Sequence, residues 1–208
     1  MNALLLGFLL LTAQNNSASP RLLSGSPPDL PPLAAEGGFV GLELRVTPSG
    51  IVREAVVIDD SPPFTAEIQK VARLWSFDEP RVDGKPAEAR VAVIGLFRAP
   101  TLLGGAPPPP KRAASPSAEI PYPTSYPTPA YPPQALEPGV VMLEVEIDEE
   151  GAVAAVEILE EAEGFQAVAV EAAQKFRFQP ARRDGRAARA FAILIFGFPQ
   201  PLTRPLRR

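Results

Sequence analysis

The chain carries few side chains that could perform chemistry, because its 208 residues include neither histidine nor cysteine. Without these residue types there is no Cys–His or Ser–His–Asp nucleophilic site, no thiolate or imidazole zinc site and no disulfide. Carboxylates, lysines and hydroxyls remain. The net charge of −4, from 20 basic and 24 acidic side chains, indicates no preference for nucleic acid.

Acidic side chains gather at two places. Asp59 and Asp60 are adjacent, as paired carboxylates for acid–base work would be, but the Ser-Pro-Pro that follows them favours a loop. The second half has an acidic cluster whose oxygens suit calcium, at a spacing that matches no EF-hand loop. It consists of Asp148, Glu149, Glu150, Glu160, Glu161 and Glu163. No hydrolase or phosphate-loop motif occurs. The sequence therefore predicts a non-enzymatic protein with no metal site and no cofactor.

Arginines gather around one turn and at the end of the chain. We expect them to face solvent, and the alternative is a basic patch for peptidoglycan carboxylates or lipid headgroups. They are Arg182, Arg183, Arg186, Arg204, Arg207 and Arg208.

The N-terminus begins with an apolar run from Ala3 to Ala13, which is too short to span a ~30 Å hydrocarbon core. A run of this size followed by small residues is typical of a secretory signal peptide, with a cleavage point between Ala13 and Gln14. No Lys or Arg precedes the run, and Leu11 is not the small residue expected before cleavage. Because the length of the run and the small residues after it outweigh these two departures, we assign residues 1–13 as a signal peptide, with an uncleaved, membrane-associated end as the alternative.

Most of the 27 prolines lie in two segments, a Pro-rich leader at residues 14–37 and a Pro-rich linker at residues 99–138. Proline fixes φ and lacks an N–H donor, so neither a helix nor a sheet should run through these segments. The linker is expected to be a spacer that reaches about 100 Å when fully extended. Its Tyr122, Tyr126 and Tyr131 are either incidental or part of a docking motif for a proline-binding domain.

Two blocks outside these segments, residues 38–98 and 139–199, align without a gap at an offset of 101 residues, with Gly151 against Gly50. Identity is modest, but the matches fall at turns and at apolar positions. We interpret the blocks as two divergent copies of one module of roughly 60 residues. Such a module is marginal alone, so the sequence leaves open whether the copies pack together or dimerise. Residues 200–208 form a basic tail.

Each block predicts a β-hairpin, a helix and a third strand. Alternating apolar residues run from Val40 to Val46, Gly50 completes a turn, and a second strand follows. The third strands, at residues 89–97 and 190–198, are apolar on both faces. The helical stripes are Phe64, Ile68, Val71 and Trp75 in the first block and Phe165, Ala169, Ala172 and Phe176 in the second. The fold class is therefore α+β, with two ββαβ modules, each a three-stranded antiparallel sheet covered by one helix.

The second block resembles the C-terminal domain of TonB, the periplasmic energy transducer of Gram-negative bacteria. That family has a glycine-containing hairpin, a helix ending in aromatic-x-Phe-x-Pro-Ala, an Asp-Gly turn and a final apolar strand. The matching residues are Gly151, Phe176, Phe178, Pro180, Ala181, Asp184 and Gly185. The first block keeps Gly50, Trp75, Phe77, Asp83 and Gly84, but has Glu79-Pro80 where the second block has Pro180-Ala181.

The resemblance implies a periplasmic module that binds a protein or peptide partner. The family domain receives a short extended segment of an outer-membrane receptor, which pairs with the sheet edge beside the last strand. An exposed edge offers unpaired N–H and C=O groups for such strand addition. We therefore expect partner binding at Ala190, Phe191, Ala192, Ile193, Leu194, Ile195 and Phe196, and at Val91, Val93 and Ile94. The alternative is that the copies cap each other's edge, or that the chain dimerises, and no free site remains.

The resemblance also has departures. The family's transducers need a transmembrane helix that carries a histidine and couples to an inner-membrane motor, whereas this chain has no histidine and only a short apolar run. The longer proline-rich segment separates the two copies instead of preceding the domain. We therefore expect an exported adaptor linked to TonB-type transmembrane transport. The alternative is a membrane-anchored transducer that passes motor force to outer-membrane receptors.

Overall fold

The computed structural model describes residues 19–31, 36–100, 107–132 and 137–200. The expected signal peptide at residues 1–13 lies outside the described residues, as does the basic tail apart from its first residue. In the described part of the chain, no helix has the length and apolar character that crossing a membrane requires.

The first half folds in the predicted order of strand, strand, helix and strand. Its main elements are β2 (Gly38–Val46), β3 (Val52–Asp60), α1 (Phe64–Ala72) and β7 (Ala89–Phe97). Short strands precede and interrupt this order: β1 (Leu22–Ser24), β4 (Ser76–Phe77), β5 (Arg81–Val82) and β6 (Lys85–Pro86).

The second half repeats the order. Its main elements are β10 (Gly139–Ile147), β11 (Val153–Glu160), α2 (Gln166–Gln174) and β15 (Ala190–Phe198). Its short strands are β9 (Tyr122–Ser125), β12 (Arg177–Gln179), β13 (Ala181–Arg183) and β14 (Arg186–Ala188), and β8 (Lys111–Arg112) lies between the halves.

One sheet of seven strands joins the two halves, in the order β11–β10–β15–β7–β2–β3–β8. Its pairs are antiparallel except at the centre, where β15 and β7 run parallel. The prediction of two separate three-stranded sheets is therefore wrong. The third strands of the two halves pair with each other, which is the capping alternative that the sequence left open.

The register of the central pair follows from the repeat. Equivalent residues of the halves differ by 101, but Ala192 lies beside Ala92 and Leu194 beside Ile94. The halves are related by an approximate two-fold axis along the strands, so equivalent residues face opposite sides of the sheet. Residues that pair across two neighbouring strands must face the same side of the sheet. Equivalent residues, 101 apart, therefore cannot pair, and the paired residues of β7 and β15 are 100 apart.

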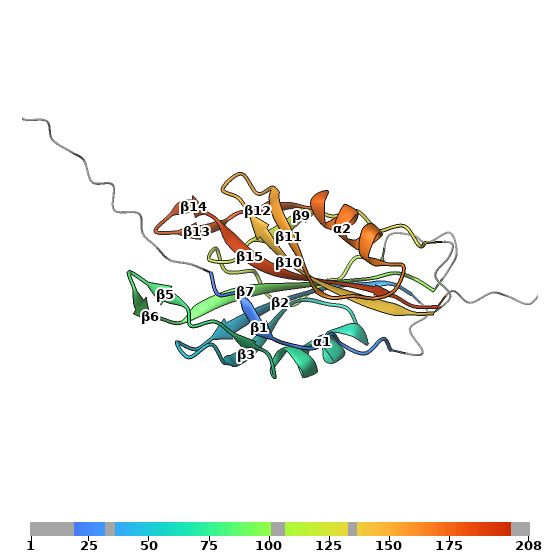
Figure 1. The fold of residues 1–208 in the computed structure, drawn as a ribbon, viewed down its shortest axis with the longest axis horizontal. Helices are drawn as coiled ribbons and strands as arrows, with labels where there is room; N and C mark the ends of the chain where they lie inside the picture. Colours follow the sequence, from blue (N-terminus) through green and yellow to red (C-terminus); the bar gives the residue numbers. More distant parts are fainter. Residues whose placement is uncertain (1–18, 32–35, 101–106, 133–136, 201–208) are drawn as a thin grey trace, which may run out of the picture.

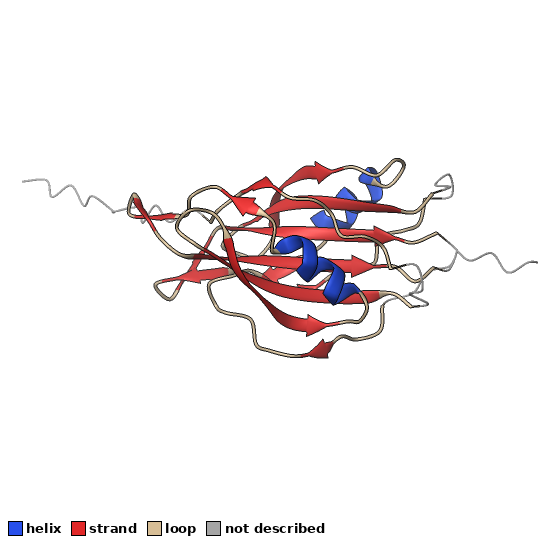
Figure 2. Cartoon of the chain, turned by 90° about the horizontal axis from the view of Figure 1, so that it is seen from below, coloured by secondary structure: helices blue, strands red, loops and turns tan. Residues whose placement is uncertain are grey.

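The sheet lies between the two helices, with α1 on one face and α2 on the other (Figure 1). Seen from below, α1 lies across the strands of the sheet (Figure 2). Because both faces are covered, the central strands are apolar on both sides, as buried parallel strands are. Every residue of β15 is buried except Phe191, and every residue of β7 except Arg90, and these two are half-buried.

Each of the two cores contains residues from both halves. The core beneath α2 includes Phe39, Ile58 and Ile94 of the first half. The core beneath α1 includes Ile193 and Ile195 of the second half, with Met142 beside them. Neither half therefore buries its own apolar residues without the other, which is why the halves form one folded unit instead of two tethered modules.

Candidate functional site: sheet edges and covering segments

The structure places the predicted partner-binding residues at the centre of the sheet. Ala192 to Phe196 of β15 pair on one side with β7 and on the other with β10. Val93 and Ile94 pair with β15 and β2 in the same way. The expectation that these strands form a free edge is therefore wrong, because each third strand occupies the edge of the other. That a partner binds there stays a prediction that this closed arrangement does not support.

The residues of the predicted structural motif hold the hairpin turn against the segment after each helix. Gly151 has a φ of 83°, and a Cβ placed on it would collide with the carbonyl oxygen of Phe178. The carbonyl oxygen of Gly151 accepts a hydrogen bond of 2.8 Å from the N–H of Phe178. Gly50 and Phe77 repeat the same contact in the first half, also at 2.8 Å. Only glycine permits this close approach of the backbone.

The other motif residues lie in the segments that follow the helices and in the hairpins beyond them. Trp75 and Phe77, like Phe176 and Phe178, are buried in the cores. Asp83 and Asp184 have φ of 51° and 50° and precede glycines in the same left-handed region. They form the tips of the β5–β6 and β13–β14 hairpins, as the two Asp-Gly pairs predict, and Ala181 is buried while Pro180 is half-buried.

The proline-rich segments belong to the repeat. At the offset of 101, Pro20 and Pro28 correspond to Pro121 and Pro129, and all four side chains are buried. We call residues 19–31 the first covering segment and residues 107–132 the second covering segment. The sequence already contained this signal, because the two segments continue the offset of the two blocks.

The short strands of the covering segments pair in equivalent places. In the first half Leu22 of β1 lies opposite Phe77 of β4. In the second half Pro123 of β9 lies opposite Phe178 of β12. The repeated unit therefore begins near residue 19 and near residue 120, earlier than the predicted boundaries at residues 38 and 139.

The first covering segment runs from the helix of its own half to the sheet face of the other half. Near α1, the indole Nε1 of Trp75 donates a hydrogen bond of 3.0 Å to the carbonyl oxygen of Ser26. Leu22 and Leu30 pack against the core beneath α1. At the other end Arg21 reaches Glu144 on β10, where its Nε donates to Oε2 at 2.6 Å.

The second covering segment does the same on the opposite face. The ring of Tyr126 stacks on Phe39 of the first half at 4.4 Å between centroids, and Tyr131 meets Phe165 of the second half edge-on at 5.4 Å. Tyr122 is 7% exposed. The expectation of an extended spacer is therefore wrong for residues 107–132, because the tyrosines fill the space between α2 and the sheet face of the first half.

A buried glutamate anchors each covering segment to the opposite half. Glu144 accepts the backbone N–H of Leu22 at 2.9 Å in addition to its bond from Arg21. Its equivalent, Glu43, accepts the backbone N–H of Ser117 at 3.0 Å and pairs with Arg90. Glu43 and Glu144 are 4% and 3% exposed. Burial of a carboxylate is tolerated because its oxygens are paired and hydrogen-bonded.

Asp59, which the sequence assigned to a loop, lies at the end of β3 and is 2% exposed. Its Oδ2 accepts the hydroxyl of Tyr122, and its Oδ1 lies 3.0 Å from Nε of Arg112. Burial, and secondarily the hydrogen bond to Asp59, raise the pKa of Tyr122 far above its usual value. All three residues belong to the contact between the second covering segment and the first half.

We expect Tyr122→Phe to lower the free energy of unfolding by about 1–2 kcal/mol at pH 7, because Asp59 loses a hydrogen bond while buried. The raised pKa of Tyr122 also predicts a pH dependence. Above pH ~10 the unfolded chain releases the phenolic proton and the folded chain keeps it, so stability falls by up to about 1.4 kcal/mol per pH unit. Urea midpoints between pH 9 and 11.5 should therefore fall less steeply in the variant than in the unaltered protein. Equal slopes would contradict the prediction.

The open edge of the sheet is β11. No described strand lies beyond it, whereas β8 covers the end of β3 at the other edge. The strand reads VAAVEILE and contains neither lysine nor proline. The equivalent strand β3 carries Arg53, which pairs with Glu88 at 2.7 Å, where β11 has Ala154. β3 carries four charged residues, whereas β11 carries two, Glu157 and Glu160. Charged residues on an edge discourage pairing with another strand, so β11 is the less protected edge.

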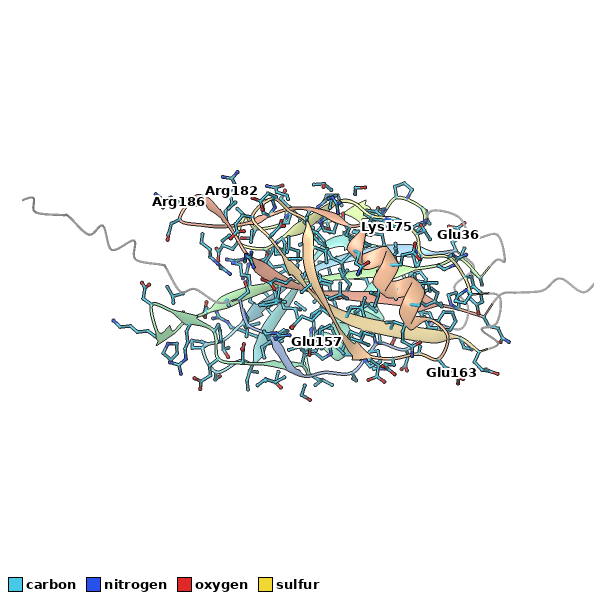
Figure 3. All side chains as sticks on the ribbon, turned by 45° about the horizontal axis from the view of Figure 1, so that its top comes forward. Glu36, Glu157, Glu163, Lys175, Arg182 and Arg186 are labelled. Atoms are coloured by element: carbon cyan, nitrogen blue, oxygen red, sulfur yellow. The ribbon has the colours of Figure 1, made fainter. Side chains whose placement is uncertain are left out.

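The basic turn and the acidic cluster lie apart. Arg182 and Arg186 lie at one end of the molecule in the β13–β14 hairpin, and Glu163 lies toward the other end (Figure 3). Arg183 is not wholly exposed, because its guanidinium donates a 2.9 Å hydrogen bond to Ser19 of the first covering segment. In the described ranges, no three His, Cys, Asp or Glu side chains are placed to hold a metal ion.

The family match of this chain lies in its second half. A search of the curated proteins finds no match. Residues 127–198, which run from within the second covering segment through β15, match the family model described as Gram-negative bacterial TonB protein C-terminal. The second half is therefore similar to the C-terminal domain of TonB, a family of the Gram-negative envelope.

Proposed function

We propose that the protein is a non-enzymatic component of the periplasm that binds an extended peptide segment of an envelope partner by strand addition. The match of residues 127–198 to a family that interacts with envelope proteins such as outer-membrane receptors supports this. The observation that carries the proposal is the open edge of β11, whose outward N–H and C=O groups meet no described strand. Strand addition to such an edge is an established mode of peptide recognition.

The binding edge in this proposal is β11, the second strand of the hairpin, whereas the sequence predicted the third strand, β15. In the closed sheet β15 has no unpaired side, whereas β11 has one along its whole length. The exposed apolar side chain of Ile158, at 38% exposed, lies on this strand and gives an added strand an apolar contact. The first half is proposed as a second, divergent copy of the same domain, whose part is to close the sheet.

The test is a titration of the full chain with ten-residue peptides that tile the periplasmic segments of outer-membrane receptors from the same genome. Binding peptides should shift the amide signals of residues 153–160 and slow their hydrogen exchange. Ile158→Lys should weaken binding at least tenfold, because a lysine on an edge strand opposes pairing. The matched control is Ile51→Lys, since Ile51 is 58% exposed and lies away from the β11 edge. Binding that shifts other residues, or no binding at all, would refute the proposal.

A further inference from the structure

The chain itself shows how an acidic strand end in this fold is completed by a basic segment. In the first half β8 pairs antiparallel with the end of β3, so that Arg112 lies opposite Asp59 and Lys111 opposite Asp60. Nε of Arg112 lies 3.0 Å from Oδ1 of Asp59. Two adjacent cations thus lie opposite two adjacent carboxylates at the edge of the sheet.

The residues after these cations continue the contact through the backbone. The N–H groups of Ala113 and Ala114 both donate to the carbonyl oxygen of Ile58, at 2.8 and 3.2 Å. Small side chains let the segment lie close to the edge at this point. The whole arrangement is a short antiparallel strand of the type Lys-Arg-Ala-Ala, bound to an acidic strand end.

The same place in the second half is acidic and open. By the offset of 101, Glu160 and Glu161 correspond to Asp59 and Asp60, and both are exposed. Neither glutamate has a cationic partner within the described part of the chain, and the same holds for Glu163. Figure 3 shows Glu163 beyond the end of β11, with Glu157 on the strand itself. Negative charge therefore gathers at the end of the open edge where the first half carries a basic strand.

Building on the proposed function, we infer that the partner segment that adds to β11 is cationic and runs antiparallel to it. Its two adjacent Lys or Arg residues lie opposite Glu160 and Glu161, and small residues follow them, as in β8. The chain's own segment of this type, β8, is already paired with the end of β3. The occupant is therefore a segment of a separate envelope protein whose positive charge complements Glu160 and Glu161.

The charges set the strength and the salt dependence of this contact. Exposed ion pairs contribute modestly, so two of them together strengthen binding by about 2- to 30-fold. Salt screens such pairs, so the gain should shrink as the ionic strength rises. The backbone hydrogen bonds of the added strand do not depend on the charges. A neutral peptide can therefore test strand addition, which is the proposed function, separately from the preference for a cationic segment.

The experiment uses the full chain and the peptide PKRAASPS, which copies residues 110–117. The peptide should shift the amide signals of residues 157–161. A peptide with Lys and Arg replaced by Ser should bind about 2- to 30-fold more weakly at low salt. The double change Glu160→Gln and Glu161→Gln should cause the same loss for the cationic peptide only. Glu150→Gln, in the hairpin turn that precedes β11, is the matched control and should leave binding unchanged.

Three outcomes would overturn the inference. Equal binding of the cationic and neutral peptides to β11 would leave the proposed function intact and refute the charge preference. Shifts at residues 58–60 instead would mean that the peptide only replaces β8. Slow exchange of residues 157–161 in the free chain, lost when residues 201–208 are removed, would identify the tail as the occupant. The absence of binding at β11 by this peptide and by every receptor peptide would refute the proposed function itself.

Discussion

Residues 107–200 produced without the first half should form a homodimer and not a stable monomer. Alone, this fragment exposes the edge of β15 that β7 covers, and it exposes Met142, Ile193 and Ile195, which are buried beneath α1. A second copy can supply both contacts, because the two halves already mimic a two-fold dimer. Sedimentation equilibrium at micromolar concentration should give twice the fragment mass, whereas the full chain should remain a monomer.

The control for this prediction is the same fragment with Ile193→Lys. The lysine would face the apolar interface, so the dimer should be lost and the fragment should unfold or aggregate. A folded, monomeric fragment with dispersed amide signals would contradict the prediction. It would show that the halves are independent modules, as the sequence alone suggested.

Glu144→Ala should lower the free energy of unfolding by about 3 kcal/mol, near the lower end for breaking a buried ion pair. The change leaves the backbone N–H of Leu22 without its acceptor and releases Arg21. The estimate stays near the lower end because the side chain of Arg21 is 46% exposed and can return to water. Urea denaturation measures the loss, and hydrogen exchange at Leu22 should become fast as the first covering segment detaches.

Two variants separate the contributions at this anchor. Glu144→Gln keeps an acceptor for Leu22 and should cost about half as much. Glu157→Ala removes the second partner of Arg21. The side chain of Glu157 is 59% exposed, so this change should lower the free energy of unfolding by less than about 1 kcal/mol. If Glu144→Ala and Glu157→Ala have equal effects, the buried carboxylate does not anchor the segment.

The two anchors are built differently although their glutamates are equivalent. The cation paired with Glu43 is Arg90, which lies on β7 within the same half. The cation paired with Glu144 is Arg21, which comes from the covering segment, and its guanidinium lies 5.0 Å from the ring centroid of Phe191, the equivalent of Arg90. Loss of Glu144 should therefore detach a covering segment more completely than loss of Glu43.

Local patterns predicted most of the secondary structure. Alternation from Val40 to Val46, with glycine at the turn, lies within β2 and its hairpin with β3. The apolar stripe from Phe64 corresponds to α1. Asp83-Gly84 and Asp184-Gly185 form hairpin tips with positive φ. These features depend on neighbouring residues, so the sequence contains all the information that they require.

The edge was mispredicted because strand pairing depends on contacts between distant residues. The third strands are apolar on both faces, from Ala89 to Phe97 and from Ala190 to Phe198. That pattern is typical of a central strand covered on both sides, and it was a signal against an exposed edge. The prolines misled in a similar way, since Pro28 and Pro129 are buried against the folded halves instead of spacing them apart.

The sequence by itself determined the repeated strand and helix order, the glycine turns and the resemblance of the second half to the TonB C-terminal domain. Only the tertiary structure decided which edge is closed, because two copies with apolar third strands bury more surface by pairing with each other than by facing water. It also decided that each covering segment reaches the sheet face of the other half, because the two helices alone do not cover all of the apolar surface of the sheet. As a result β11, and not β15, is the edge left open for a partner.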